Sequence, residues 1–366
     1  MKKQISIVLS FCCILILCSC HKGDKISVPT IDLDFTNKSQ TTIDGVAVGL
    51  ESAGLYSIYL KDSLFVVHVA LNDHYLDLYK YPSFEHITNI CTKGRARNEF
   101  ANDPQNPVAQ LYYSGSDIII PLVDDESHIR EINLSKSIED GIAKVVSYND
   151  CMDFNTGRCA VLNEGPGHLF CNIFCEYDEM DLRKSKAPRY EYLVDGKVEK
   201  EIKIFPSLCR VDEPAAISAA YSGSMRKHPH KDVIIQPMQY MDYILFFDLE
   251  NDKYFAIHQA GSSTYNDNVI ALDDELHFTD AKTTDDCFMV LYWNGKQNVG
   301  LQSQSQRRPE LMVFNWSGDF LGSAILGERV VDIEYDDVNK ILIGKHASND
   351  KVYCFDLSSF MGSIGL

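Results

Sequence analysis

Two arginines are the residues of this chain best suited to ligand chemistry. Arg95 and Arg97 stand two positions apart in a polar stretch that follows a predicted strand. A guanidinium group is a planar, permanently charged donor, so a close pair could grip a carboxylate or a sulfate. Loops between strands are the usual location for such contacts. We take both arginines as candidate ligand-binding residues; the alternative is a solvated loop with local salt bridges.

Histidines and acidic residues offer weaker candidates. His228-Pro-His230 is a local histidine cluster, but the proline holds the dipeptide extended and directs the two rings to opposite sides. Acidic doublets such as Asp336-Asp337 fall where turns are predicted, and Asp is favoured in turns because its side chain bonds the local backbone. No spacing resembles a zinc ligand set. We predict no metal site and no cofactor.

A short β-hairpin recurs six times, and this repeat predicts the fold. Each copy joins an apolar-aromatic strand to a second strand through a polar turn, at intervals of 41 to 68 residues. Self-similarity at roughly 40–50 residues is typical of β-propellers, in which each repeat is one four-stranded blade. We predict an all-β, six-bladed β-propeller over residues 28–366. The copies begin at Tyr75, His128, Tyr190, Tyr243, Leu311 and Val352.

The last repeat holds too few strands to complete a blade. Residues 330–335, 341–345 and 352–357 give three strands before Leu366. An incomplete blade would leave an unpaired sheet edge. We therefore expect the last blade to be closed by an N-terminal strand, and Ile26 to Leu33 is the candidate.

The N-terminus has the pattern of a bacterial lipoprotein signal. Two lysines precede an apolar run of about 13 residues, which is too short for a membrane span of roughly 20. Leu17-Cys18-Ser19-Cys20 then resembles a lipobox, in which an aliphatic and two small residues precede the cysteine that receives lipid. We predict a signal peptide at 1–19, a lipidated Cys20 and a tether at 20–27. Acyl chains would then hold the protein on a membrane.

The net charge of the chain restricts the class of partner that it can bind. The formal charge is −18 at pH 7, and it becomes −20 after loss of residues 1–19, which hold two lysines and no acid. So acidic a surface repels nucleic acid, which we exclude as a partner.

Cys171 and Cys175 fall on one face of a predicted strand, about 13 Å apart. That separation is too long for a disulfide, so we expect both to be small core residues. Cys151 and Cys159 flank a predicted turn, and a bridge between them stays open.

Two stretches resemble the six-bladed, TolB-like and NHL-like propeller lipoproteins of Bacteroidetes. The segment Lys93-Gly-Arg-Ala-Arg-Asn-Glu-Phe100 is similar to the G-x-G-P-x-E-F loop of that family, with Ala96 and Arg97 in place of its second glycine and its proline. The run LMVFNWSGDFLGSAIL, with the strands that follow it, is similar to the last two blades of the family. The resemblance spans roughly residues 26–360. It implies fold and envelope location but no reaction.

The resemblance also assigns structural roles within the first of these stretches. It makes Gly94 a turn residue that needs conformational freedom. Glu99 is expected to accept backbone hydrogen bonds, and Phe100 to dock between blades. All three roles are structural, so Arg95 and Arg97 remain the candidates for ligand contact in this loop.

The sequence as a whole favours a binding protein over an enzyme. It contains no nucleophile elbow, phosphate-binding loop, zinc-protease motif or dinucleotide fingerprint, and we assign no catalytic residue. We expect a non-enzymatic binding or scaffold propeller for a protein or glycan partner, anchored in the outer membrane of a Gram-negative bacterium. Only one acid follows closely after Cys20, whereas surface-exported lipoproteins of this group tend to carry several, so we expect the periplasmic side. The alternative is a propeller enzyme, a lyase or hydrolase acting on glycans or peptides.

Overall fold

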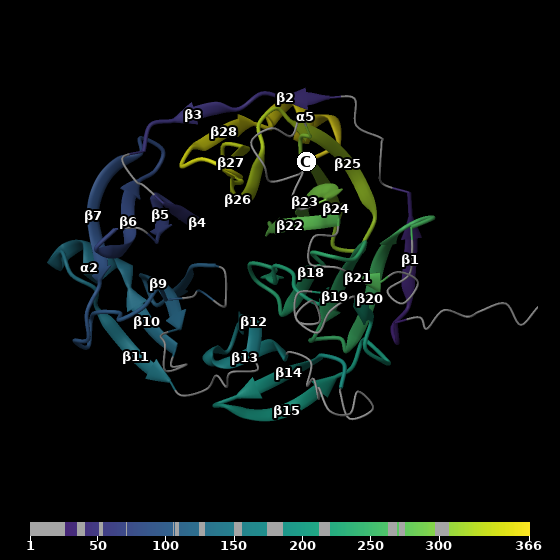
Figure 1. Cartoon of the computed structure of the whole chain (residues 1–366), viewed down its shortest axis with the longest axis horizontal. Helices are drawn as coiled ribbons and strands as arrows, with labels where there is room; N and C mark the ends of the chain where they lie inside the picture. The colour runs from purple at the N-terminus through teal and green to yellow at the C-terminus, as the bar shows by residue number, and fades with distance from the viewer. Residues whose placement is uncertain are drawn as a thin grey trace, which may run out of the picture.

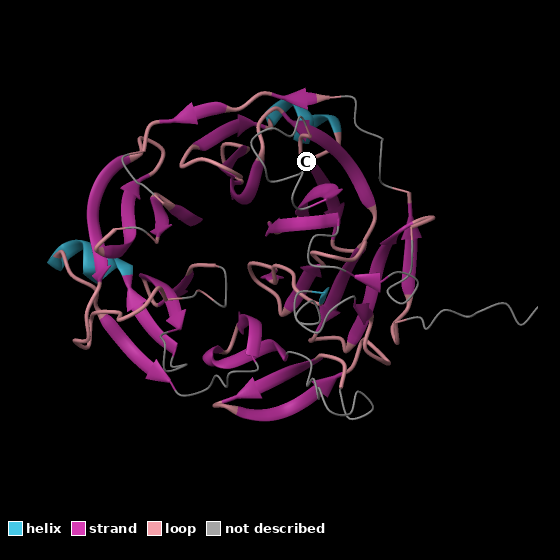
Figure 2. Cartoon of the chain, viewed as in Figure 1, coloured by secondary structure: helices cyan, strands magenta, loops and turns pink. Residues whose placement is uncertain are grey.

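Six β-sheets of four or five strands lie around a central channel in the computed structural model, which is a six-bladed β-propeller as the repeats predict (Figure 1). Strands dominate, and the short helices lie at the rim (Figure 2). None of the helices in the described part of the chain has the length and apolarity that a membrane crossing needs. The predicted signal peptide, Cys20 and most of the tether lie outside the described residues. The structure describes residues 26–34, 41–50, 54–70, 72–104, 106, 110–123, 129–149, 156–173, 186–211, 220–262, 269–270, 275–296 and 307–366.

Blades one to three each consist of four antiparallel strands that follow one another along the chain. The first strand of each blade lies nearest the channel, and the fourth lies at the outside (Figure 1). Blade one contains β4 (Leu55–Lys61), β5 (Leu64–Val69), β6 (His74–Lys80) and β7 (Glu85–Thr92). Blade two contains β8 (Tyr112–Ser114), β9 (Asp117–Val123), β10 (Ile129–Asn133) and β11 (Val145–Asn149), with helix α2 (Leu134–Asp140) between the last two strands. Blade three contains β12 (Thr156–Leu162), β13 (Gly165–Ile173), β14 (Arg189–Val194) and β15 (Lys197–Ile202).

Blades four to six follow the same plan, and each receives one more strand from the N-terminus. Blade four contains β17 (Arg226–Lys227), β18 (Val233–Pro237), β19 (Tyr243–Asp248) and β20 (Lys253–Gln259). Blade five contains β22 (Glu275–Thr283), β23 (Cys287–Lys296), β24 (Glu310–Asn315) and β25 (Phe320–Leu326). Blade six contains β26 (Val330–Asp336), β27 (Ile341–His346) and β28 (Val352–Asp356), and helix α5 (Ser358–Ser363) follows it. A small parallel pair joins β16 (Arg210–Val211) to β21 (Val269–Ile270).

An N-terminal strand closes the sixth blade as expected, but it is not the strand that we expected. The strand β3 (Val46–Val48) pairs antiparallel with β28 and completes the blade. The predicted segment instead supplies β1 (Thr30–Leu33), which pairs in parallel with β20 of blade four, and β2 (Thr42–Ile43) pairs in parallel with β25 of blade five. Because β3 comes last before blade one begins at β4, it is the stretch that reaches the seam between blades six and one. We call β1, β2 and β3 the N-terminal belt.

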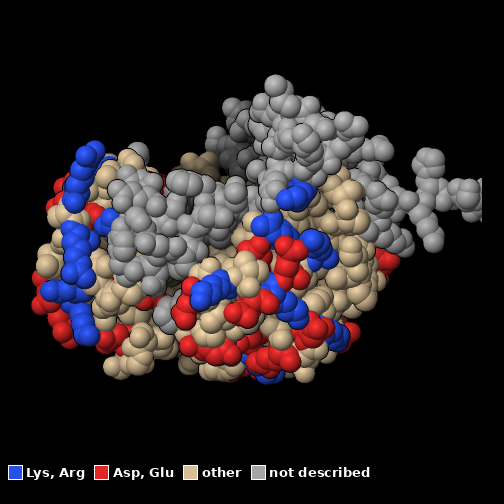
Figure 3. All heavy atoms as spheres, turned by 90° about the horizontal axis from the view of Figure 1, so that it is seen from below, with Lys and Arg blue, Asp and Glu red and all other residues tan. Residues whose placement is uncertain are grey.

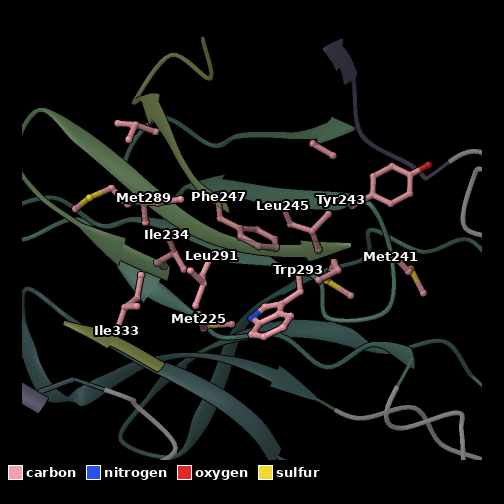
Figure 4. Close-up of a cluster of buried hydrophobic side chains, with 14 of the residues drawn as sticks. Met225, Ile234, Met241, Tyr243, Leu245, Phe247, Met289, Leu291, Trp293 and Ile333 are labelled. Atoms are coloured by element: carbon pink, nitrogen blue, oxygen red, sulfur yellow. The ribbon is translucent and has the colours of Figure 1, made fainter. Parts of the chain in front are cut away.

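The strands of each blade are apolar in proportion to how deeply they lie between neighbouring blades. The second strand of blade one, β5, is buried at every position, whereas the outer strand β15 of blade three is mostly exposed. A strand covered on both faces must be apolar on both faces, which explains the continuous Ile, Val and Phe runs. The largest core cluster extends through blades three to six and contains the buried Trp293 (Figure 4).

The first strand of each recurring hairpin is the third strand of a blade, but in two blades a helix follows it instead of a second strand. In blade six α5 follows β28, and in blade two the stretch after β10 forms helix α2. The Asn133 side chain accepts a hydrogen bond from the Lys136 backbone N–H, and Gly141 at the other end has φ 68°. An Asn N-cap and a left-handed glycine are helix-ending signals that outweigh the β pattern over so short a segment.

Blade three holds a disulfide between Cys159 and Cys171. The two residues lie directly opposite each other on β12 and β13. The expectation that Cys171 is an unbonded core residue is therefore wrong, and the bridge left open between Cys151 and Cys159 does not form, because Cys159 pairs with Cys171. The bridge depends on which strands are neighbours, and this pairing is not visible in the spacing of the cysteines alone. Cys151 and Cys175 lie outside the described residues.

Replacing both bridged cysteines with serine is expected to lower the free energy of unfolding by about 3 kcal/mol, because the bond closes a loop of 12 residues in the unfolded chain. Denaturant unfolding measures the change. Cys287→Ser, at a buried free thiol, controls for loss of an apolar sulfur. Alkylation of Cys159 or Cys171 in unfolded, unreduced protein would contradict the bridge.

Candidate functional site

The inner strands of the six blades surround a polar channel that contains two cavities. We call the smaller one, of about 290 Å³, the narrow chamber, and the larger one, of about 660 Å³, the wide chamber. The narrow chamber lies at the N-terminal ends of the inner strands, the wide chamber lies at their C-terminal ends, and Arg226 lines both. Residues lining the narrow chamber include Tyr59, Arg158, Arg226, Asp280, Asp332 and Lys345. Those lining the wide chamber include Lys61, Lys227, His228, Lys282, Glu334 and Tyr335.

A layer of buried ion pairs separates the two chambers. Arg226 of blade four bonds to Asp280 of blade five, and their side chains are only 6% and 4% exposed. Lys282 Nζ lies 2.6 Å from Glu334 Oε2 of blade six. Buried charges are tolerated when they are paired, and removing one partner is costly because the other stays uncompensated. This layer therefore ties blades four, five and six together at the centre.

Asp332 completes this layer on the narrow-chamber side. Its Oδ2 accepts a hydrogen bond of 2.9 Å from the Ile58 backbone N–H of blade one, and its carboxyl is hydrogen-bonded to Asp280. Burial and the nearby Asp280 carboxylate raise the pKa of Asp332 well above its ordinary value. The two carboxyl groups thus share a proton that Asp332 holds, in a bond that joins blades five and six.

The remaining wall of the narrow chamber presents hydrogen-bond donors. Burial raises the pKa of Tyr59 to about 12, so its phenol stays protonated. The Tyr59 hydroxyl lies 2.9 Å from the Ser57 hydroxyl. Arg158 Nη1 donates to the Asn106 carbonyl oxygen at 2.9 Å, which fixes the guanidinium beside the chamber. The narrow chamber is therefore lined largely by hydrogen-bond donors and cationic groups.

A group of cations continues from the narrow chamber over blades five and six. We call Arg308, Arg329, Lys345 and Lys351 the basic patch. Burial lowers the pKa of His346, and the four patch residues lower it further because each places positive charge beside the imidazole. Burial and Arg308 likewise lower the pKa of the Arg329 guanidinium.

Three members of the basic patch lack a counter-charge. Arg308, Lys345 and Lys351 form no ion pair with any residue of the described part of the chain. On the side of the ring seen in Figure 3, by contrast, basic and acidic side chains are interspersed. Uncompensated positive charge beside a cavity is notable in a chain of net charge −18, because it attracts anions that the rest of the surface repels.

The wide chamber is already balanced by its own residues. Lys282 is paired with Glu334, and Lys227 Nζ donates to Asn163 Oδ1 at 2.7 Å and to the His228 carbonyl at 3.0 Å. The chamber as a whole is lined by four lysines and arginines and four acidic residues. It therefore offers less net charge to a ligand than the narrow chamber does.

The loop after β7 has the contacts of a structural element. The Ala96 backbone N–H donates to Glu99 Oε2 at 2.9 Å, and Phe100 is buried in the cluster shared by blades one and two. Arg130 of blade two lies over the Phe100 ring at 4.9 Å. A Cβ atom on Gly94 would lie 1.9 Å from Glu99 Oε2, so a side chain at this position would have to displace the Glu99 carboxyl group.

The structure places the candidate arginines of this loop away from the channel. Arg95 and Arg97 are exposed, and neither lines a chamber. Their role as ligand contacts stays a prediction. The histidines of the earlier cluster are also separated in environment: His228 is buried against the Trp316 ring, with 4.7 Å between centroids, while His230 is exposed near Asp285. The described residues contain no group of three side chains that could hold a metal ion.

A relay of three polar residues on blade four has the order of a hydrolase triad. Asp32 Oδ1 lies 2.9 Å from His258 Nδ1, and His258 Nε2 lies 3.0 Å from Ser262 Oγ. However, the Ser262 hydroxyl also donates to the Gln259 carbonyl of its own turn at 2.9 Å. None of the three residues lines either chamber of the channel. We interpret the relay as the fastening of β1 onto blade four.

Sequence reasoning missed the residues of the narrow chamber. They come from five blades and from the segment before blade two, and these groups lie about 50 residues apart along the chain, so no local motif contains two partners from different blades. One signal was present: Asp280 and Lys282, like Asp332 and Glu334, are charged residues two positions apart in strands where polar and apolar residues largely alternate. Residues at that spacing share one face of a strand, and the face is the one that lines the channel.

Comparison with known proteins supports the fold and gives no family. No family model matches the chain, and no curated protein matches it. Among solved structures, a member of the DUF4221 family from Bacteroides vulgatus ATCC 8482 superposes with a TM-score of 0.56 at 9% identity, covering 92% of this chain and 98% of that one. A protein of Bacteroides fragilis NCTC 9343, named for its expected export, gives a TM-score of 0.53 at 10% identity, covering 90% and 99%. Identities this low show a shared fold alone.

Asp332→Asn is expected to change how stability depends on pH. The folded-state pKa of Asp332 is raised, so the stability from its protonated form is complete below the unfolded pKa and is lost as pH rises through the folded pKa. An amide can donate to Asp280 at every pH. The variant should therefore match the wild type at pH 4.5 and melt a few degrees higher at pH 8, as thermal unfolding measures.

Asp280→Asn provides the contrast for this experiment. It leaves Arg226 without its buried partner, so it should lower the melting temperature at both pH values. The difference in melting temperature between the wild type and Asp332→Asn should change between pH 4.5 and pH 8. An equal difference at the two pH values would contradict a shared proton.

Proposed function

We propose that this chain is an exported binding protein of the bacterial envelope that uses the narrow chamber and the basic patch to hold an anionic partner, a protein or a glycan. The observation that carries the proposal is the uncompensated positive charge at Arg158, Lys345, Arg308 and Lys351, gathered at one mouth of the channel in an acidic chain. Complementary charge attracts and orients a partner and excludes like-charged competitors. A rigid ring of packed blades keeps these groups in place without a ligand.

The proposed location rests on the N-terminal pattern. A signal at 1–19 and a lipidated Cys20 would deliver the propeller to the outer membrane, on its periplasmic side, with the membrane as a partner through the acyl chains. Two of the structural neighbours come from Bacteroides, and one of these is named for its expected export. Both points support an envelope role.

A second candidate function is an enzyme acting on the bound glycan or peptide, a lyase or a hydrolase. It is favoured by the proton donors in the narrow chamber, where the protonated Asp332 carboxyl and the Tyr59 phenol lie beside cations that could hold an anionic substrate. General acid–base catalysis needs a proton donor within reach of the bound group. We rank it below binding because Asp332 already donates within the wall of the chamber.

The binding proposal is tested with immobilised polymers that differ in charge and backbone. The probes are polygalacturonate, dextran sulfate, poly-L-glutamate and uncharged dextran. The wild type should bind at least one anionic probe in a salt-sensitive manner and should not bind dextran. Arg308→Glu combined with Lys351→Glu should weaken that binding by about tenfold, which corresponds to about 1.4 kcal/mol.

The matched control is Lys80→Glu combined with Lys197→Glu, which makes the same charge change at exposed residues of blades one and three. It should change binding less than twofold. Equal loss in the control and in the patch variant would mean that net charge alone governs binding, and failure of every anionic probe would refute the proposal. A decrease in the length of a polymer in the same samples would favour the enzymatic function over the binding function.

Cys20→Ser is expected to release the protein from the membrane. Acylation requires the cysteine thiol, and the described residues offer no membrane-spanning helix to replace it. Metabolic labelling with a fatty-acid analogue and membrane fractionation measure the change. Retention of the serine variant in the membrane fraction, or absence of label from the wild type, would overturn lipid anchoring.

A further inference from the structure

The narrow chamber is unusual in having contributions from every part of the ring. Its lining comes from the inner strands of blades one, three, four, five and six and from the segment before blade two, which supplies Asn106. At about 290 Å³ it is at the small end of the range of ligand pockets. It therefore accommodates one small chemical unit rather than a length of polymer.

Neutral polar groups dominate this lining. Besides its charged residues, the chamber is lined by five hydroxyl-bearing side chains and one amide, and by a single apolar side chain, that of Val331. A ligand that complements such a wall must itself carry several hydroxyl or carbonyl oxygens. The hydroxyl-bearing and amide residues are Tyr56, Ser57, Tyr59, Ser224, Thr279 and Asn106.

Two of these hydroxyls are unsatisfied. The hydroxyl oxygens of Ser224 and Thr279 are out of contact with solvent and have no hydrogen-bond partner among the described residues. A buried polar group without a partner is costly, because it has lost its hydrogen bonds to water. Both residues line the same chamber, so one bound molecule can satisfy both.

Two cations stand beside these hydroxyls without an acidic partner. Arg158 donates to a backbone carbonyl oxygen, and Lys345 forms no ion pair within the described chain. The acids nearest to them are already engaged: Asp280 holds Arg226, and Asp332 accepts from Ile58. The chamber therefore combines positive charge with hydroxyl-bonding groups.

We propose that the narrow chamber binds one carboxylated sugar unit of an acidic glycan, with Arg158 and Lys345 on its carboxylate and Ser224 and Thr279 on its hydroxyls. This inference rests on the proposed anion-binding function and names its ligand class. A sugar acid carries one charge and several hydroxyls on a compact ring, which matches the wall. An acidic peptide would present amides and a methylene stem, for which the chamber has one apolar side chain.

Tyr56 gives the unit a platform at the entrance. Its side chain lines the chamber and is half exposed, with 50% of its surface accessible. The C–H face of a sugar ring can pack on an aromatic ring and remove apolar surface from water. The basic patch then lies where the next charged units of the glycan would follow, because Lys345 belongs to both the chamber and the patch.

The test is monosaccharide binding by calorimetry and by ligand-observed NMR. Galacturonate and glucuronate should bind and should compete with polygalacturonate, whereas galactose and the methyl ester of galacturonate should bind at least tenfold more weakly. Thr279→Val, which replaces the hydroxyl by a methyl group of the same shape, should weaken galacturonate binding by about fivefold or more. Ser224→Ala should act in the same direction.

The control separates this inference from the proposed function. Arg308 lies in the basic patch and outside the chamber, so Arg308→Glu should weaken polygalacturonate binding by a larger factor than it weakens the binding of free galacturonate. If polymers bind but neither sugar acid binds or competes, the narrow chamber is not a binding site for a sugar unit, although the proposed anion-binding function is retained. Equal affinity for galacturonate and inorganic sulfate would overturn it in favour of a general anion site, and unchanged affinity in Thr279→Val would overturn the assignment of the hydroxyls. Thermal unfolding of each variant checks that it is folded.

Discussion

The seam between blade six and blade one is the constraint on which the rest of the structure depends. A ring of sheets has no free edge only when its last blade meets its first. Here the contact is an apolar cluster that contains Leu55, Phe65 and Val67 of blade one with Ile343 and Val352 of blade six. The strand β3 covers the outer edge of the same blade. The ring is therefore closed in two places, by the apolar cluster between blades six and one and by the strand β3 at the outer edge of blade six.

The centre of the ring is subject to the opposite constraint. Six inner strands converge there, and several of their channel-facing side chains, such as Arg226, Asp280 and Glu334, are charged and yet buried. The structure satisfies them by bonding one blade to the next, through Arg226 with Asp280, Lys282 with Glu334, and Asp332 with Ile58. The residues left over, with charge or hydroxyls to spare, are those we assign to ligand binding. The polar residues that hold the blades together and those that we assign to ligand binding thus belong to one group around the channel.

The fold was largely predictable because the blades repeat a local pattern. Hairpins such as those beginning at Tyr190 and Tyr243 correspond to the third and fourth strands of blades three and four. Strand partners between distant segments were not predictable in this way. The choice of Val46–Val48 as the closing strand depends on the path of the chain around the ring, and the Cys159–Cys171 bridge depends on strand register.

The candidate site was less accessible to sequence reasoning than the fold. Arg95 and Arg97 stood out because they are adjacent in sequence, yet the chamber is assembled from residues such as Arg158, Thr279 and Lys345, each on a different blade. Their proximity is a property of the closed ring and has no counterpart in linear spacing. The alternation of charge in β22 and β26 marks the channel face but not its partners.

The order of pairing in the N-terminal belt has a mechanical consequence. Tension applied at the N-terminus reaches β1 first, where four residues pair with β20. It reaches β2 on blade five next and β3 at the seam last. The first two strands can peel away while the sixth blade stays closed, because β3 is held separately by β28. The N-terminal belt would therefore detach in steps under tension at the N-terminus, and the pairing of the sixth blade would be the last to break.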